Sequence, residues 1–368
     1  MNYREIVELK KRMDFNLTEA ETLVKLVQEA QLKGEKAQKD MERLREVSVD
    51  ITKDFEMNDY IRDEGILKDV SVKTETGVGI DGSFQLVGGI GGIWYAPISV
   101  ARVTFDRGLS SQPRVDIFWA GIQEVKEQVE HNIQQTAAVM MLSAESKALL
   151  DWGTSGRQGI VFIDGPIVDP PVYGDREYVK DRCEAIEKCL SSSILVGCVK
   201  RSRDIFLIEF LGSLKTPSSG YLSNFPSDQH LMLYVFGNLR RRNYSGALFT
   251  KWIDISKSNR IFELYANNGI YVTSCFFQKS KSSAVLRLDA PFLEPPSENQ
   301  EMVEKRMTEI VRVCSDWTYP GHDYPAPVFL AHDKCNIREG CAQVLYEDII
   351  TKSTSVDPLN QILITQLR

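Results

Sequence analysis

The stretch Gly77-Val-Gly-Ile-Asp-Gly-Ser83 is a short apolar segment that ends on an acid, and Val161-Phe-Ile-Asp-Gly165 repeats the pattern later in the chain. Runs of this composition are typical of buried strands. Because successive side chains of a strand alternate between the two faces, Asp81 and Asp164 point away from the isoleucine before each of them. Two such strands predict a sheet that carries carboxylates at its surface. An Asp-Gly pair is also a common turn, so a structural role for both stays open.

The composition is that of a globular protein: 368 residues, 43% hydrophobic and 26% charged, with a net charge of −7. This length predicts one elaborated domain or two. We expect a cytoplasmic protein without a membrane span, because no apolar run is long enough to cross a bilayer and the first residues do not resemble a signal peptide. The acidic total argues against a wholly basic nucleic-acid coat, although it can conceal a local basic groove.

The seven cysteines form no CxxC pair. Neither a disulfide framework nor a structural zinc site is therefore indicated, and we expect buried free thiols.

The N-terminal segment, residues 1–70, has apolar positions at helical spacing among dense charges. Gly34 interrupts the pattern, which predicts two helices or an antiparallel helical pair. Asn16, with Glu19 three residues later, fits a cap for the second helix. The segment is either an arm for dimerisation or docking, or a helix that packs on the body.

Residues 71–214 predict the first part of an α/β core. Three β-rich runs come first, with short connections that favour an antiparallel meander. A long helix over 123–150, a strand at 159–165, a helix over 176–190 and a strand at 193–200 follow. The order β-β-β-α-β-α-β is the layout of a mixed, ribonuclease H-like sheet with flanking helices.

The remainder predicts an inserted β region over 215–296 and a C-terminal part, 297–368, that completes the core. The inserted region has a hairpin signal around Asn267-Asn268-Gly269. The C-terminal part opens with a helix near Ser297, because Ser297 and Gln300 have the spacing of a capping box.

A third acid, Glu145, lies on the long helix at the flank of its apolar stripe. If this helix covers the first strand, Asp81, Glu145 and Asp164 converge. Carboxylates so close repel one another unless cations lie between them. Such a cluster suits two ions of Mg²⁺ or Mn²⁺ and the hydrolysis of phosphate esters. His332, directly after an apolar run, is the candidate imidazole ligand, although a hydrogen-bonded core histidine is the alternative, and Asp333 beside it leaves open which of the two faces the ions.

The ordered set Asp81, Glu145, Asp164, Tyr324 and His332 resembles the NurA family of nucleases, over about residues 75 to 345. The resemblance implies a ribonuclease H-like fold, with metal ligands at Asp81, Glu145, Asp164 and His332. It implies that Tyr324 is an active-site tyrosine and that Lys200 contacts phosphate.

For function, the resemblance implies a Mn²⁺- or Mg²⁺-dependent 5′ to 3′ exonuclease on single- and double-stranded DNA, with endonuclease action on single strands as an open addition. Such an enzyme acts in DNA end resection, double-strand break repair and homologous recombination. The resemblance also implies a homodimer that works with a hexameric HerA-type ATPase. The chain has no GxxxxGK[ST] motif of its own, which fits an ATPase supplied by a partner.

Two basic clusters are candidates for DNA binding: Lys200 with Arg201 and Arg203, and Arg240 with Arg241 and Arg242. Each alone is typical of a solvated surface. Two other functions stay open, an actin-like or sugar-kinase-type ATPase, which shares the sheet topology, and a catalytically silent dimeric adaptor.

Overall fold

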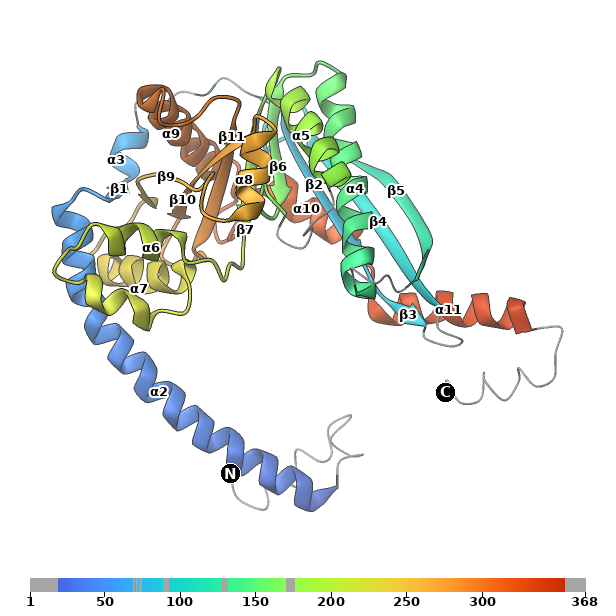
Figure 1. Cartoon of the computed structure of the whole chain (residues 1–368), viewed down its shortest axis with the longest axis horizontal. Helices are drawn as coiled ribbons and strands as arrows, with labels where there is room; N and C mark the ends of the chain where they lie inside the picture. The colour runs from blue at the N-terminus through green and yellow to red at the C-terminus, as the bar shows by residue number, and fades with distance from the viewer. Residues whose placement is uncertain are drawn as a thin grey trace.

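A computed structural model describes residues 19–68, 70, 72, 75–88, 93–126, 132–169 and 176–354 (Figure 1). The strands are β1 Ile61–Asp63, β2 Gly77–Phe84, β3 Val87–Gly88, β4 Trp94–Phe105, β5 Arg114–Val125, β6 Gly159–Asp164, β7 Ser193–Val199, β8 Leu248–Thr250, β9 Ile253–Asp254, β10 Tyr271–Gln278 and β11 Leu286–Phe292. The helices are α2 Ala20–Met57, α3 Glu64–Leu67, α4 Ile133–Thr154, α5 Arg176–Leu190, α6 Phe206–Ser213, η3 Ser219–Asn224 (a 3-10 helix), α7 Asp228–Arg241, α8 Arg260–Asn267, α9 Gln300–Asp316, α10 Ala326–Cys335 and α11 Glu339–Thr354.

The strands form one mixed sheet in the order β1-β8-β10-β11-β7-β6-β2-β4-β3, with β5 paired to β4 and β9 to β10. At its centre β2, β6 and β7 are parallel, whereas β4 and β5 are antiparallel to their neighbours. The predicted mixed α/β sheet with flanking helices is therefore confirmed.

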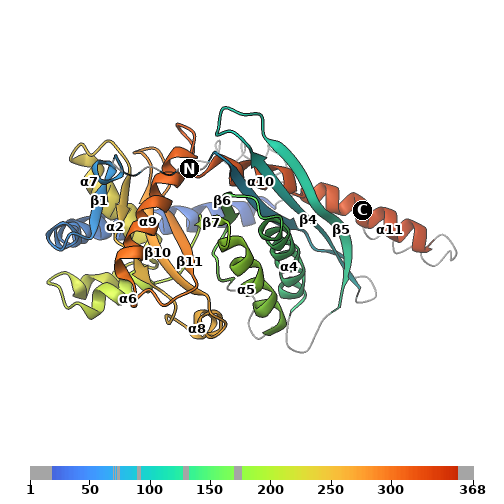
Figure 2. The same cartoon turned by 90° about the horizontal axis from the view of Figure 1, so that it is seen from above.

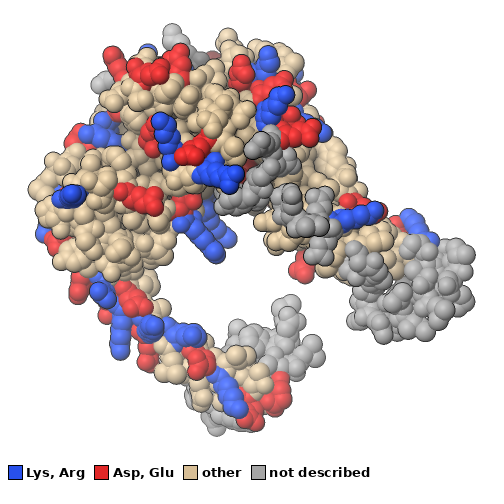
Figure 3. All heavy atoms as spheres, viewed as in Figure 1, with Lys and Arg blue, Asp and Glu red and all other residues tan. Residues whose placement is uncertain are grey.

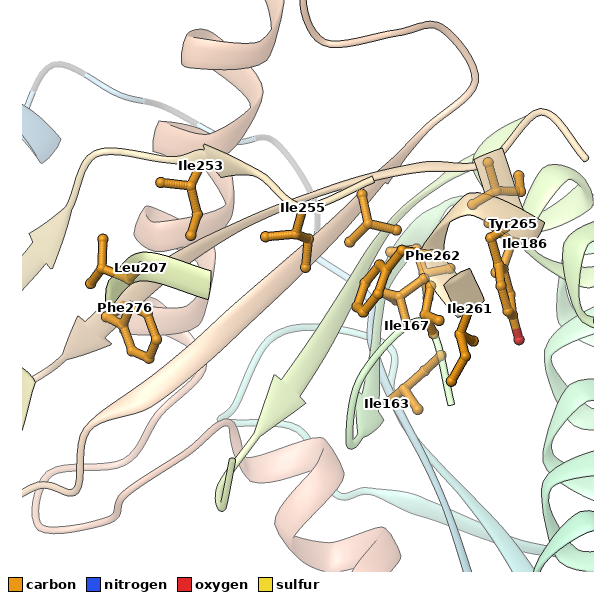
Figure 4. Packing of buried hydrophobic residues seen from close by; sticks show 14 of the residues in the cluster. Ile163, Ile167, Ile186, Leu207, Ile253, Ile255, Ile261, Phe262, Tyr265 and Phe276 are labelled. Atoms are coloured by element: carbon orange, nitrogen blue, oxygen red, sulfur yellow. The ribbon is translucent and has the colours of Figure 1, made fainter. Parts of the chain in front are cut away.

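The two faces of β6 show how the sheet is covered. Val161 and Ile163 belong to a core that includes α4 and α5, while Ile160 and Phe162 belong to a second core that includes α9 and α10. Burial on both faces explains why β6 is apolar throughout rather than alternating. Figure 2 shows α4 and α5 side by side against one face of the sheet, with α10 on the other face. In Figure 4, Ile163 lies near Ile261 and Phe262 of α8, which extend the first core.

Helix α10 lies unusually close to β2. A Cβ atom built on Gly79 would lie 2.1 Å from the backbone of Pro327, and one built on Gly77 would lie 2.5 Å from the ring of Trp317. Only glycine allows such approaches. The contact at Gly79 fixes α10, and the residues that it carries, against β2, while the contact at Gly77 fixes Trp317, which directly follows α9.

The predicted break at Gly34 is wrong. Helix α2 continues through Gly34 as one helix of 38 residues, and Figure 1 shows it extending away from the body. Glycine costs about 1 kcal/mol in a helix interior, which strong helix formers on either side can offset. The Glu19 side chain caps the helix by accepting from the amides of Glu21 and Thr22. The cap predicted at Asn16 lies outside the described residues.

The long helix begins at Ile133 and not at Gln123, because β5 continues to Val125 along its partner β4. Asn132 and Gln135 form a capping box at its start. Helix α9 begins at Gln300, close to the predicted start, but its cap is Asn299 and not Ser297.

The segment 215–296 contains helices as well as strands. Its strands extend the main sheet, since β11 pairs with β7 and β10 pairs with β11. Asn267 ends α8, and Gly269, with φ of +83°, turns the chain into β10, so the predicted hairpin at this point is wrong. The division of the chain into four segments stays a prediction.

Across the described residues, no helix is both long enough and apolar enough to cross a bilayer.

Candidate metal centre

Asp81 and Asp164 lie side by side because their strands are parallel neighbours. In the register of β2 and β6, Ile80 is opposite Ile163, so the next residue of each strand is an acid. Side chains of paired residues project on the same face. Both acids thus lie on the face that α9 and α10 cover. The side chain of Asp81 is 7% exposed and that of Asp164 is 12% exposed.

His332 reaches the two acids from α10. Its Nδ1 atom lies 2.7 Å from Oδ2 of Asp81 and 3.3 Å from Oδ2 of Asp164. One ligand atom from each of the three residues lies within 4.8 Å of the others. The carboxylate of Asp333 pairs instead with Lys334, away from the two acids. The histidine, not the adjacent acid, faces the cluster.

Glu145 approaches from α4 on the opposite side of the sheet. It is 3% exposed, and Gly82 makes room for it, because a Cβ atom at this position would lie 2.7 Å from Oε1 of Glu145. Glu145 is not part of the compact group of three. It lines, with Asp81, Asp164 and His332, a cavity of about 590 Å³. The four predicted metal ligands therefore meet at one cavity.

Two acids of this cavity, Asp164 and Glu145, have raised pKa values. Burial, and then the charge of Asp81, raise the pKa of Asp164 to about 6, although Lys200 opposes the rise. Burial and Asp81 also raise the pKa of Glu145 well above its ordinary value, against the opposing charge of Arg182. The hydrogen bond to Asp81 raises the pKa of His332. Carboxylate oxygens with one imidazole suit Mg²⁺ or Mn²⁺, whose charge would relieve this repulsion.

Lys200 and Tyr324 extend the cluster. The Nζ atom of Lys200, which directly follows β7, lies 2.5 Å from Oδ2 of Asp164 and 3.8 Å from the centre of the Tyr324 ring. Tyr324 packs in turn against Phe329 of α10, with ring centres 5.8 Å apart. Lys200 therefore links the predicted tyrosine to the acids. Arg201, next along the chain, is exposed.

Residues 75–337 match the model of one protein family, the NurA domain. The chain belongs to the NurA family. The predicted family is thus confirmed, and with it the expected enzyme class, a nuclease.

The fold agrees with solved structures. The NurA nuclease from Sulfolobus solfataricus is 15% identical and has a TM-score of 0.56, over 93% of this chain and 99% of that one. A second NurA crystal structure is 11% identical, with a TM-score of 0.52, over 85% of this chain and 97% of that one. No curated protein matches the sequence.

Two further charged residues of this NurA chain, Asp169 and Arg182, belong to the surroundings of the cavity and were not singled out from the sequence. Asp169 lines the cavity, and its Oδ2 accepts a hydrogen bond of 2.5 Å from the hydroxyl of Tyr178. Arg182 of α5 is completely buried, with Nε 3.6 Å from the same oxygen of Asp169 and NH1 3.4 Å from Oγ of Ser146. Asp169 stands five residues after Asp164, which is a weak signal. Nothing in the charged pattern of α5 distinguishes Arg182 from its exposed neighbours.

The burial of Arg240 argues against the DNA-binding role predicted for it. Arg240 is 5% exposed, and its guanidinium donates to the side chain and the carbonyl of Gln278 at 3.1 Å each and to the carbonyl of Tyr244 at 3.0 Å. It therefore ties the end of α7 to the end of β10. Arg241 donates to Asn238, and Arg242 pairs with Glu56 of α2. All three arginines make contacts within the fold, which does not test a DNA-binding role for the exposed Arg241 and Arg242.

Proposed function

We propose that this NurA chain is a divalent-metal-dependent deoxyribonuclease that hydrolyses phosphodiester bonds with two Mn²⁺ or Mg²⁺ ions per site. The observation that carries the proposal is the compact group of Asp81, Asp164 and His332, with Glu145 on the same cavity. The volume of this cavity lies within the usual range of ligand sites, roughly 300 to 1,000 Å³. When bound, such ions supply a more acidic water and stabilise the leaving oxygen.

The residues of the chain have separable roles in this proposal. Asp81 and Asp164 hold the ions between two strands, and His332 adds a nitrogen ligand after it loses its proton. Glu145 adds a carboxylate ligand for the ions from α4, on the opposite side of the sheet. Lys200 neutralises Asp164 in the metal-free protein. An ion bound at Asp164 would take over this role, and the ammonium of Lys200 could then bind a phosphate oxygen. Tyr324 limits where that ammonium can lie, because its ring covers the other side.

The finer details of the function follow from the resemblance to NurA nucleases. We propose 5′ to 3′ exonuclease action on single- and double-stranded DNA ends in the resection of broken DNA, together with a HerA-type hexameric ATPase. A homodimer is part of the proposal. The exposed length of α2 supports it, because a helix that extends from the body has surface for a second chain.

The test is the degradation of end-labelled single- and double-stranded DNA with Mn²⁺, with Mg²⁺ and with a chelator. We expect cleavage only with the ions, and its loss in Asp81→Asn. The matched control is Asp333→Asn, which removes an exposed acid next to His332 that does not face the cluster, and should keep full activity. Equal activity of wild type and Asp81→Asn would reject the nuclease assignment of this site. ATP binding without DNA cleavage would favour the kinase-type alternative, and the absence of both would favour the adaptor.

A further inference from the structure

The loop that carries Lys200 connects β7 to α6 and spans residues 200–205. It holds three cationic residues, the half-buried Lys200 and the exposed Arg201 and Arg203. In Figure 3 basic side chains project into the hollow beneath the end of β7, which Figure 1 shows to be the region of this loop. A lysine side chain has four flexible carbon atoms, so the position of its ammonium depends on how firmly the main chain beneath it is held.

Gln229, in the first turn of α7, holds this main chain directly. Its Nε2 donates to the carbonyl of Lys200 at 2.6 Å, and its Oε1 accepts from the amide of Ser202 at 2.9 Å. The same Nε2 also donates to the carbonyl of Val285, directly before β11, at 2.7 Å. A primary amide has two N–H donors and one oxygen, and all are used here. One side chain thus joins the main chain on both sides of Arg201, directly after the Lys200 side chain, to the sheet.

Arg287 of β11 provides a second anchor on the same loop. It is 2% exposed, and its NH1 donates to Oγ of Ser202 at 3.2 Å and pairs with Asp204. Asp289 holds the other edge of the guanidinium at 2.8 and 3.0 Å. The loop is therefore held at Lys200 and Ser202 by Gln229, and at Ser202 and Asp204 by Arg287.

We propose that Gln229 is a positioning residue for Lys200. By fixing the main chain at residues 200 and 202, it holds the ammonium between Asp164 and Tyr324, where it can pass from the acid to a DNA phosphate. Gln229 contacts neither acid nor tyrosine, and it acts only through the lysine. This inference rests on the role of Lys200 in the proposed function. It also gives the segment 215–296 a task in the chemistry, since α7 and β11 both belong to it.

A double-mutant cycle tests the coupling. Gln229→Leu keeps the size of the side chain and removes all three hydrogen bonds. We expect it to lower the rate of DNA cleavage at saturating DNA on the order of tenfold to a hundredfold, the loss that follows a misplacement of about 1 Å. In a Lys200→Ala background the same substitution should have no further effect, because residues that act through one another are not additive.

The matched control is Asn238→Leu, another buried amide of α7, whose Nδ2 donates to Ser48 and Thr52 of α2 at 3.0 Å each. A substitution that only loosens α7 should change cleavage equally with and without Lys200. A readout without catalysis is amide hydrogen exchange at Ser202 in the metal-free protein, which should become faster in Gln229→Leu and stay unchanged in Asn238→Leu. Should Gln229→Leu fail to fold, Gln229→Glu retains the acceptor for Ser202 and loses both donated bonds, and the same cycle applies to it.

The outcomes separate the two proposals. Full cleavage by folded Gln229→Leu, or an equal loss in both backgrounds, overturns the positioning role and leaves the nuclease proposal intact. Full activity of Lys200→Ala overturns the assigned role of Lys200 and the positioning role with it. Reduced cleavage in each single variant without further reduction in the double variant, together with faster exchange at Ser202, supports Gln229 as the positioning residue.

Discussion

At the scale of single residues, Asp81 is the most connected group of the site. Its Oδ2 atom lies 2.7 Å from Nδ1 of His332 and 3.5 Å from Sγ of Cys335, both on α10. The sequence predicts Asp81, Asp164 and His332 because each follows an apolar run and their chemistry is that of a metal site. Arg182 could not be predicted in the same way, since burial of a charge depends on packing between helices that no local pattern records.

Substitution of either strand acid should remove activity without unfolding the chain. We expect Asp81→Ala and Asp164→Ala each to lower DNA cleavage by more than about a hundredfold, because loss of a residue that only supports a ligand already costs roughly 10–100-fold. Stability of the metal-free protein should be kept or raised, since one member of a repelling pair is gone. Cleavage assays and thermal unfolding without metal measure both, and a folded variant with full activity would contradict the assignment.

Metal binding should weaken as the pH falls. The pKa of Asp164 is raised to about 6, and that of His332 is also raised, so both carry protons in mildly acidic solution that an ion must displace. We expect the Mn²⁺ affinity to fall as the pH drops, first as His332 takes up its proton, above the ordinary pKa of a histidine, and more steeply below about pH 6, where Asp164 is protonated as well; the fall is up to about tenfold per pH unit for each proton displaced. Calorimetric titration from pH 5 to 8 measures it, and an affinity independent of pH would oppose the proposed ligands.

The carboxyl group of Asp164 also makes the stability of the metal-free protein depend on pH, in a direction that follows from its raised pKa. Its pKa is higher in the folded chain than the value of about 3.9 expected when unfolded. The folded state therefore binds this proton more tightly. The stability that Asp164 contributes is fully present below about pH 4 and is lost as the pH rises through about 6.

At the scale of elements, the site depends on how α10 is seated on β2. The strands β2 and β6 could be predicted because they are continuous apolar runs, and their parallel pairing follows from the helix between them. Helix α7 was missed although Leu231, Met232, Val235, Phe236 and Leu239 recur at helical spacing and are buried. Its β-branched and aromatic residues favour a strand locally, and packing against the sheet and α2 overrides that preference.

The close packing of α10 on β2 can be tested with two glycine-to-alanine substitutions. Gly79→Ala places a Cβ atom 2.1 Å from the backbone of Pro327, so α10 must shift and carry His332 with it. We expect a destabilisation of about 1–3 kcal/mol and weaker Mn²⁺ binding. Gly340→Ala in α11 meets nothing within 4 Å and serves as the control, with unchanged binding. Chemical denaturation and calorimetry give the two quantities; unaltered Mn²⁺ affinity in Gly79→Ala would argue against this dependence.

At the scale of the whole molecule, a net charge of −7 coexists with cationic residues placed at the site. Figure 3 shows both signs interspersed over the visible face, including along α2. The strands β10 and β11 join the main sheet beside β7, which could not be predicted because pairing between distant strands has no local signature. That pairing places α7 and β11 next to the loop of Lys200.

DNA affinity should depend on the loop after β7 and not on the end of α7. We expect Arg201→Ala and Arg203→Ala each to weaken DNA binding and to reduce the salt dependence of log K by about one unit for each phosphate that the variant no longer neutralises. Arg242→Ala, which removes the partner of Glu56, should leave both unchanged. The measurement is fluorescence anisotropy in Asp81→Ala over a range of salt. A salt dependence that falls only in Arg242→Ala would reverse this assignment.

Two of the three glycines of β2 have a consequence for the alignment of the strands. Because β6 is apolar on both faces, burial alone would tolerate a shift of one residue between the strands. Such a shift would turn one acid to the opposite side and separate it from the other. Gly77 and Gly79, which admit the Trp317 ring and the Pro327 backbone, fit only one alignment. The placement of Asp81 beside His332 of α10 thus depends on residues that have no side chain, and larger residues at these two positions would push the strand acid and the histidine apart.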